Sequence, residues 1–308
     1  MNAVPTKRRT LGFAACFVAS GLWGCGFFFG KIALAEMNVG AMVFYRFFFA
    51  VLVLLPVLIT HKPGLNAREW RILLLASFLG VPVQFLLQFY GLSLTTVSHA
   101  SLMVGTMPVI LAVGAAIFAH ERMDAIGWAA LAASTLGAAF IALGGHNSHG
   151  GASLAGDLWV VLSLLIALSW ILMNKQLMQS HSAIVITAYG LFAGMAMLIV
   201  IVPISFGWPP VAHVSWKAWS SLAASGILCT ATTTFLWNWG LTQVPASQAG
   251  VLLNMEPLVG SILGIAVLGE TLGPSAWTGA ALILAAAITL TTHSKTHIRK
   301  PDYAEAKS

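Results

Sequence analysis

The feature that most limits how this chain can fold is a succession of long apolar runs that extends over almost its whole length. A helix needs roughly 20 apolar residues to cross the hydrocarbon core of a bilayer. About ten runs reach that length, and they predict an all-α polytopic membrane protein with ten transmembrane helices. The expected spans cover residues 11–34, 40–60, 70–90, 97–118, 125–144, 155–177, 183–205, 217–238, 246–268 and 275–292.

The composition agrees with a lipid environment and excludes several classes of protein. Only 8% of the residues are charged and 58% are hydrophobic, whereas soluble globular chains carry about 25% charged residues. The net charge of +6 does not indicate nucleic-acid binding, because Lys and Arg sit in short clusters between the apolar runs. The expected partners are therefore the lipid bilayer and a small-molecule substrate, with no nucleic acid.

No motif in the sequence indicates a cofactor or a resident metal. The cysteines Cys16, Cys25 and Cys229 all fall within apolar runs and form no CxxC pair, so neither a disulfide framework nor a zinc site is expected. The chain has no Walker loop, so ATP is not expected to drive it directly. No Ser/His/Asp arrangement occurs at a credible spacing, which argues against an enzyme.

The basic residues predict the orientation of the chain in the membrane. The first apolar run follows Lys7, Arg8 and Arg9 and is too long for a signal peptide, so it is expected to be retained as the first helix. An even number of spans places both termini on one side. Twelve Lys and Arg residues fall on that side and two, Lys31 and Lys217, on the other. The positive-inside rule then places both termini in the cytoplasm, in a bacterial-type inner membrane.

The two halves of the sequence repeat one another. At an offset of 149 residues, similar residues recur in the same order, and nearer the N-terminus the offset is 147. The matched pairs are Trp70 with Trp219, Gly91 with Gly240, Ser98 with Ser247, Pro108 with Pro257, Glu121 with Glu270, Trp128 with Trp277, Trp23 with Trp170, and Pro56 with Pro203. The expected organisation is a cytoplasmic segment (1–10), a five-helix repeat (11–144), a loop (145–154), a second repeat (155–292) and a cytoplasmic tail (293–308).

A repeat with an odd number of spans has a functional meaning. Its two copies must cross the membrane in opposite directions, which relates them by a pseudo-twofold axis in the membrane plane. Inverted repeats around a site near the bilayer midplane are the recurrent architecture of alternating-access transporters. A membrane enzyme or a receptor has no comparable need for them.

Each half also ends in a shared pattern that resembles a known family. The first half carries Gly91-Leu92, Ala100-Ser101, Pro108 and Glu121, and the second carries Gly240-Leu241, Ala249-Gly250, Glu256-Pro257 and Gly269-Glu270. With Trp23-Gly24 in the first span, the chain resembles the EamA-type permeases of the drug/metabolite transporter superfamily over about residues 11 to 292. This resemblance implies ten helices around a central cavity and favours export of amino acids or related metabolites. The departure at His120-Glu121 is expected to affect a loop, not the cavity.

Glu256 is the strongest single functional candidate. It lies about ten residues into the ninth span, which at 1.5 Å per residue is near the bilayer midplane. A carboxylate at that depth is expensive and is expected to face the bundle interior or a wet cavity. It is interpreted as a proton carrier or as a counter-charge for a substrate amino group, with a structural, hydrogen-bonded Glu before Pro257 as the alternative.

Further candidates come from polar, aromatic and proline residues at matching depths. Gln84 and Gln88 share a helix face, and the repeat pairs them with Thr233 and Trp237. Substrate binding by this face competes with interhelical hydrogen bonding, and a cavity wall of aromatic rings competes with core packing. The remaining candidates are Trp23, Trp170, Asn174 and Asn254 for substrate binding, Arg46 for pairing with a carboxylate, and Pro108 and Pro257 as gating breaks or packing kinks.

These observations predict a secondary transporter of small metabolites such as amino acids. We expect an exporter that works by alternating access, driven by proton exchange or by the substrate gradient. A multidrug or organic-cation exporter is the alternative if Glu256 binds cations directly. A non-transporting membrane adaptor or an intramembrane enzyme is the alternative of another class.

Overall fold

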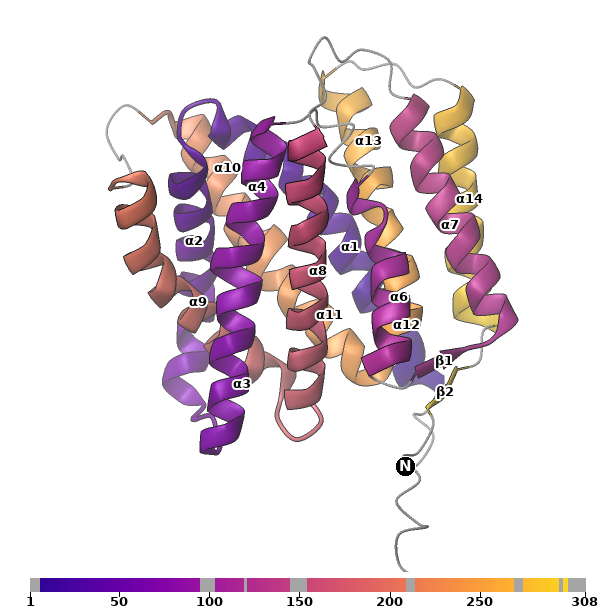
Figure 1. The fold of residues 1–308 in the computed structure, drawn as a ribbon, viewed down its shortest axis with the longest axis horizontal. Coiled ribbons are helices and arrows are strands. Elements are labelled where there is room, and N and C mark those ends of the chain that lie inside the picture. The colour runs from indigo at the N-terminus through magenta and orange to yellow at the C-terminus, as the bar shows by residue number, and fades with distance from the viewer. Residues whose placement is uncertain are drawn as a thin grey trace, which may run out of the picture.

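The computed structural model describes residues 6–94, 103–118, 121–144, 154–208, 214–268, 274–293 and 296–298. The described chain is nearly all helical, and its long helices lie side by side in one bundle (Figure 1). The helices are α1 (Thr6–Leu34), α2 (Val39–Thr60), α3 (Ala67–Phe78), α4 (Gln84–Leu94), α6 (Met107–Phe118), α7 (Ala125–Gly144), α8 (Leu154–Leu177), α9 (Ala183–Phe206), α10 (Trp216–Gly226), α11 (Thr233–Gln243), α12 (Ala246–Val251), α13 (Met255–Leu268) and α14 (Pro274–His293). The shorter elements are the π-helices η1 (Leu79–Val83) and η2 (Ile227–Thr232), the 3₁₀-helix η3 (Leu252–Asn254), and the strands β1 (Glu121–Met123) and β2 (Thr296–Ile298).

The helices carry the apolar character that the sequence predicts for a membrane protein. Five are long and apolar enough to cross a membrane: 7–34, 39–60, 67–94, 154–177 and 183–206. Shorter apolar helices cover 107–118, 125–140 and 277–290. Large apolar side chains also cover the outer surface, as shown by Ile204 at 80% exposure and Ile288 at 63%. An outer surface of this kind is expected where lipid, rather than water, is the solvent.

Two helical rods contain a wide turn at the same place in the repeat. The rod formed by α3 and α4 is interrupted by η1, which includes Pro82, and the rod formed by α10 and α11 is interrupted by η2. The two interruptions are related by the sequence offset of 149 residues. A π turn loosens the regular backbone hydrogen bonding and is frequently found at functional sites.

Repeat-related glycines allow two pairs of helices to approach closely. A Cβ added to Gly240 on α11 would lie 2.5 Å from Cys16 Sγ and 3.0 Å from the carbonyl oxygen of Gly12 on α1. A Cβ added to Gly91 on α4 would lie 2.8 Å from the carbonyl oxygen of Gly156 on α8. Small residues at helix contacts are typical of membrane bundles, where packing rather than the hydrophobic effect drives association.

The prolines predicted to break the spans lie at the start of helices. Pro108 is the second residue of α6, and Pro257 is the third residue of α13, directly after η3. A proline fits the first turn of a helix because its missing N–H would have no partner there. Each proline therefore follows an interruption of its span and does not bend a continuous helix.

Two short strands depart from the all-helical prediction. Strand β1 pairs antiparallel with β2, with Glu121 opposite Ile298 and Met123 opposite Thr296. Both strands lie outside the apolar runs, where hydropathy carries no signal, and the pairing satisfies their backbone groups. It also joins the segment after residue 293, expected to be a simple tail, to the connection between α6 and α7.

Candidate functional site

A cavity lies among the helices, and residues from most of the bundle line it. The space between the lining atoms is about 850 Å³, counting the part that is open to the surroundings. Its walls come from α1, α2, η1, α4, α6, α8, α9, η2, α11, η3 and α13. Both halves of the sequence therefore contribute to one site, and the only charged residues in the described lining are Arg46 and Glu256.

Arg46 projects from α2 and is held in place by the wide turn η2. Its side chain is buried, with 3% exposure. Arg46 Nε donates a hydrogen bond to Thr230 Oγ1 at 2.7 Å, and Nη2 donates to the carbonyl oxygen of Cys229 at 3.0 Å. Thr230 Oγ1 donates in turn to the carbonyl oxygen of Ser225 at 3.0 Å, so its own proton points away from the guanidinium.

Aromatic rings complete the setting of this guanidinium. Arg46 Cζ lies 4.9 Å from the ring centroid of Phe85 and 5.9 Å from that of Phe89, within the range of cation–π contacts. The two rings are stacked on consecutive turns of α4. A guanidinium has five N–H donors, and the two hydrogen bonds to η2 use only some of them. The remaining donors are available to an anionic group in the cavity.

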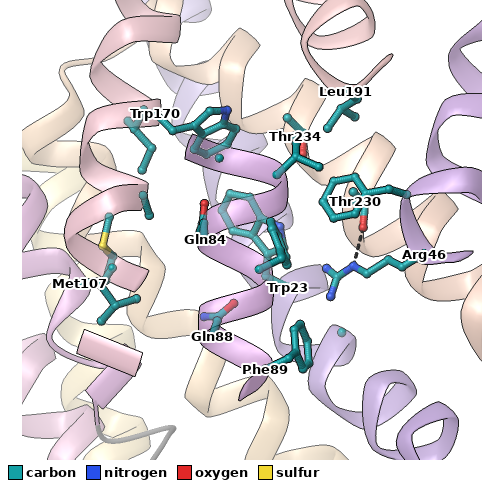
Figure 2. Close-up of a pocket in the computed structure, with 18 of the residues that line it drawn as sticks. Trp23, Arg46, Gln84, Gln88, Phe89, Met107, Trp170, Leu191, Thr230 and Thr234 are labelled. Carbon is teal, nitrogen blue, oxygen red and sulfur yellow. Dashed lines mark hydrogen bonds between the residues drawn. The ribbon is translucent and has the colours of Figure 1, made fainter. Parts of the chain in front are cut away.

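Two amides predicted as a polar face do line the cavity. Gln84 and Gln88 lie on adjacent turns of the same helix in Figure 2, where the Arg46 side chain extends from α2 toward Trp23. Gln84 Oε1 is buried and has no hydrogen-bond partner within the described residues. An unpartnered buried acceptor is costly, so this oxygen indicates a place where a donor on a ligand or a water would bind.

The repeat-related counterparts of these glutamines do not line the cavity. Thr233 is fully buried, and its hydroxyl donates to the carbonyl oxygen of Thr230 at 3.1 Å. Trp237 is also fully buried, and its ring centroid lies 5.3 Å from that of Trp23. The neighbouring residues Thr230 and Thr234 line the wall instead. Thr230 and Thr234 are the repeat counterparts of Val81 and Phe85, which also line the cavity, so the two halves share these positions and differ at those of the glutamines.

The remaining predicted residues divide between the cavity and the packed interior. Trp23 and Trp170 both line the wall, and the ring of Trp170 lies so close to Gly80 that a Cβ added to this glycine would be 2.2 Å from Trp170 Cδ1. Asn254 is fully buried, and its Nδ2 donates to Ser134 Oγ at 2.9 Å. Asn174 is buried in α8 outside the lining. The two asparagines therefore belong to the packing around the site.

Glu256 lies in the cavity wall, on the first turn of α13. No hydrogen bond or ion pair of its carboxylate is found within the described residues. Arg46 acts on it electrostatically from across the cavity. The site thus presents one basic and one acidic residue in a wall whose other residues are aromatic, apolar, amide or threonine.

Sequence reasoning missed some residues at this site. Phe85 and Phe89 follow Gln84 and Gln88 by one position, about 100° around the helix, so the polar face did not point to them. Thr230 and Thr234 are the repeat counterparts of Val81 and Phe85, and no polar or aromatic pattern marked these four positions. Glu121, assigned to a loop, is buried at 3% exposure and makes contacts between the two halves.

Comparisons with known proteins agree with this arrangement. The sequence model of the EamA-like transporter family matches residues 10–143 and 154–292. A protein named biotin transporter from Salmonella typhimurium is 27% identical over 276 residues, covering 88% of this chain and 90% of its own length. A protein named probable terminal-alkyne amino-acid exporter from Streptantibioticus cattleyicolor is 27% identical over 228 residues, covering 71% of this chain and 72% of its own length.

A solved structure shares the fold. One crystal structure matches with a TM-score of 0.75 at 17% sequence identity, and the match covers 90% of this chain and 95% of that chain. At this identity the likeness concerns the fold alone. An uncharacterized transporter of Bacillus subtilis, YetK, is 22% identical over 274 residues, covering 87% of this chain and 83% of its own length.

Proposed function

Because this chain belongs to the EamA-like transporter family, we propose that it is a secondary transporter that exports small metabolites such as amino acids by alternating access. The proposal includes ten membrane-spanning helices in two inverted five-helix repeats. It also places both termini in the cytoplasm and the chain in a bacterial-type inner membrane. Family membership and the names of the relatives support a transporter, the internal repeat and the distribution of Lys and Arg support the spans and their orientation, and the residues of the cavity support the substrate class.

The arginine in the cavity is the observation that favours a substrate with a carboxylate group. Arg46 is buried, oriented by two hydrogen bonds and left with donors free on the cavity side. Burying a charge is costly unless it is paired, and here the nearest acidic group forms no ion pair with it. A carboxylate on a substrate would complete the site, because the guanidinium matches carboxylate geometry.

The rest of the cavity fits the other parts of an amino acid. Glu256 offers a counter-charge to an amino group, and Gln84 Oε1 offers an unpartnered acceptor. The rings of Trp23 and Trp170 provide an apolar wall for a side chain. One relative is named as an exporter of an amino acid, which agrees with this choice.

Alternating access is supported by helix interruptions that occur at matching positions in the two halves of the chain. The interruptions η1 and η2 occupy repeat-related positions, and so do the helix starts at Pro108 and Pro257. Discontinuous helices around a shared cavity are typical of inverted-repeat transporters. In such proteins the two repeats exchange conformations, and the site opens first to one side of the membrane and then to the other.

One observation favours a second candidate, an exporter of organic cations. A buried carboxylate next to aromatic rings recognises cations by charge and by cation–π contact, and Glu256, Trp23 and Trp170 supply both in this cavity. The two candidates differ in the residue that receives the charged group. Arg46 is essential for a carboxylate substrate and dispensable for a cation.

Transport by the purified protein in proteoliposomes tests the proposal. Labelled amino acids and organic cations are offered with and without a pH gradient. We expect saturable flux of at least one amino acid, and we expect Arg46→Gln to reduce it at least tenfold. Arg46→Lys keeps the charge without the fork geometry and is expected to be intermediate, and Arg71→Gln, at an exposed arginine on α3, serves as the control.

Three results would contradict the proposal. Absence of saturable flux for every compound would oppose the transporter assignment. Normal amino-acid flux in Arg46→Gln would oppose a carboxylate contact at this residue. Flux of organic cations alone, unaffected in Arg46→Gln and lost in Glu256→Gln, would establish the second candidate.

A further inference from the structure

A second buried glutamate lies outside the cavity, where the segment after α6 meets α8 and α12. Glu121 Oε1 accepts from Lys175 Nζ at 2.6 Å and from the amide of Ala246 at 3.1 Å. Glu121 Oε2 accepts from the amide of Ser247 at 2.9 Å and from Ser247 Oγ at 2.8 Å. Both carboxylate oxygens are thus bonded twice, and three of these bonds go to the first residues of α12.

These contacts connect three parts of the cavity wall. Glu121 follows α6, which reaches the cavity through Met107, and Lys175 lies near the end of α8, which reaches it through Trp170. Ser247 is the second residue of α12, which leads through η3 into α13, and this stretch reaches the cavity at Leu253 and Glu256. Glu121 belongs to the first matched segment of the chain, and Lys175 and Ser247 belong to the second. The contact therefore joins the two halves beside the cavity.

The residues around this contact are tightly packed. Residues 246–249 are buried to 1% exposure or less, and Glu121 itself is at 3%. Arg9 Nη2, at the start of α1, donates to Gln248 Oε1 at 3.2 Å and adds a further link at this end. None of these residues lines the described cavity. This packed contact therefore lies outside the cavity lining, on the side of the bundle at which α1 begins.

We propose that Glu121 is a positioning residue that holds this end of the transport pathway closed. In this inference, which rests on the proposed alternating access, its bonds to Lys175 and Ser247 are present in the conformation seen here and break when the pathway opens toward the start of α12. A carboxylate is suited to such a contact because charge-assisted hydrogen bonds are strong yet reversible. The pair also spans the two halves, whose relative movement must open one end.

The chain contains a matched contact at the opposite end of the bundle. Glu36 follows α1, a helix of 29 residues that spans about 43 Å at 1.5 Å per residue. Its carboxylate accepts from the amide and the hydroxyl of Ser215, each at 2.6 Å, as Glu121 does from Ser247. Glu36 is exposed and forms no salt bridge within the described residues. Glu36→Gln therefore replaces a carboxylate that accepts from a serine, as Glu121→Gln does, but it breaks no buried ion pair. It serves as the matched control.

Hydrogen exchange in the full-length protein measures the contact directly. The amides of Ala246 and Ser247 donate to Glu121, so their exchange rates report whether the contact is made. We expect Glu121→Gln to accelerate exchange of these amides at least tenfold. We expect Glu36→Gln to change their exchange less than twofold.

Labelling from each side of the membrane measures closure. Thr234 lines the cavity, and Thr234→Cys can be labelled with a charged, membrane-impermeant maleimide in vesicles of both orientations. Thr242→Cys, at an exposed residue close to the start of α12, identifies which side is which. We expect Glu121→Gln to accelerate labelling of Thr234→Cys at least fivefold from the α12 side only, and Glu36→Gln to leave it unchanged.

The outcomes separate a closing role from a local one. Faster exchange without faster labelling from the α12 side would show that Glu121 only caps α12 and would overturn the proposal, as would no change in either measurement. If Glu121→Gln does not fold, Lys175→Gln and Ser247→Ala each remove one partner. Twofold to fivefold increases in both readouts are then expected, and their absence in both variants would also overturn the proposal. Labelling needs no substrate, so it decides this inference even if the transport assay fails.

Discussion

The two buried glutamates of this chain, Glu121 and Glu256, occupy opposite kinds of environment. Glu121 receives four hydrogen bonds, one of them from the Lys175 ammonium. Glu256 lies in the cavity wall with no hydrogen bond or ion pair in the described structure, and Arg46 attracts it from a distance. The sequence identified Glu256 as a site residue but placed Glu121 in a loop and gave no indication of its buried contacts.

The difference shows which buried charges are free to act on a ligand. A carboxylate whose oxygens are all bonded to the protein is a fixed part of the structure, and its removal leaves those donors unpaired. A carboxylate that faces a cavity without partners can receive a proton or a cationic group. This difference is why we propose a role in the chemistry of transport for Glu256 and a positioning role for Glu121.

The largest expected effect concerns Glu256. In Glu256→Gln, we expect flux driven by a pH gradient to fall by about a hundredfold or more, which corresponds to roughly 2.7 kcal/mol. The reason is that the amide neither carries a proton nor neutralises an amino group. Initial rates in proteoliposomes measure the effect. In Glu121→Gln the same flux should stay within tenfold of the wild type. Equal losses of flux in both variants would contradict different roles for the two glutamates.

The second prediction concerns stability, for which the substitution of Glu121 should have the larger effect of the two. We expect Glu121→Gln to reduce the free energy of unfolding by about 2 kcal/mol, because Lys175 loses its buried partner and the donors of Ser247 lose a charged acceptor. Thermal unfolding in detergent measures the change. Glu256→Gln should leave the unfolding temperature unchanged or raise it, because within the described residues its carboxyl has no hydrogen bond or ion pair to lose. A loss of stability in Glu256→Gln alone would identify Glu256 as the structural residue.

The smallest expected effect is a pH dependence that belongs to Glu121. Burial raises the pKa of this carboxyl, but the Lys175 ammonium and the donors of Ser247 outweigh burial and leave the pKa below the ordinary value of 4.5. A lowered pKa in the folded state stabilises the protein above the ordinary pKa, and this contribution is lost as the pH falls through the folded value. The difference in unfolding temperature between wild type and Glu121→Gln should therefore be constant from pH 7 to pH 5 and shrink below about pH 4.5. A constant difference at all pH values would contradict this account.

Several features of the fold could be predicted from the sequence because they depend on local composition. Long apolar runs predict helices, and the structure has helices in the described part of those runs. The residue spacing of Gln84 and Gln88 placed both on one face, and both line the cavity. Trp23, Trp170, Arg46 and Glu256 also line it, as expected for polar and aromatic residues that lie deep within apolar runs.

Other features could not be predicted because they depend on backbone geometry or on distant partners. The repeat suggested that Thr233 and Trp237 would match Gln84 and Gln88, but both are packed in the interior, and Thr230 and Thr234 line the wall instead. Asn174 and Asn254 are polar residues within apolar runs as well, yet only packing decides that both are buried outside the cavity lining, with Asn254 bonded to Ser134. Hydropathy gave no indication of the pairing of β1 with β2.

The sequence by itself determined that the protein is surrounded by lipid, that it is helical and to which family it belongs. Apolar length, charge distribution and an internal repeat are properties of consecutive residues, and hydropathy or direct comparison detects them. The tertiary structure decided how each buried charge is satisfied. Lys175 and Ser247 lie 54 and 126 residues from Glu121 in the chain, and only the packing of the helices brings them to its carboxylate, whereas Glu256 is left facing a cavity. Whether a buried charge is fixed or available depends on neighbours that are distant in sequence, and those neighbours are set by the fold.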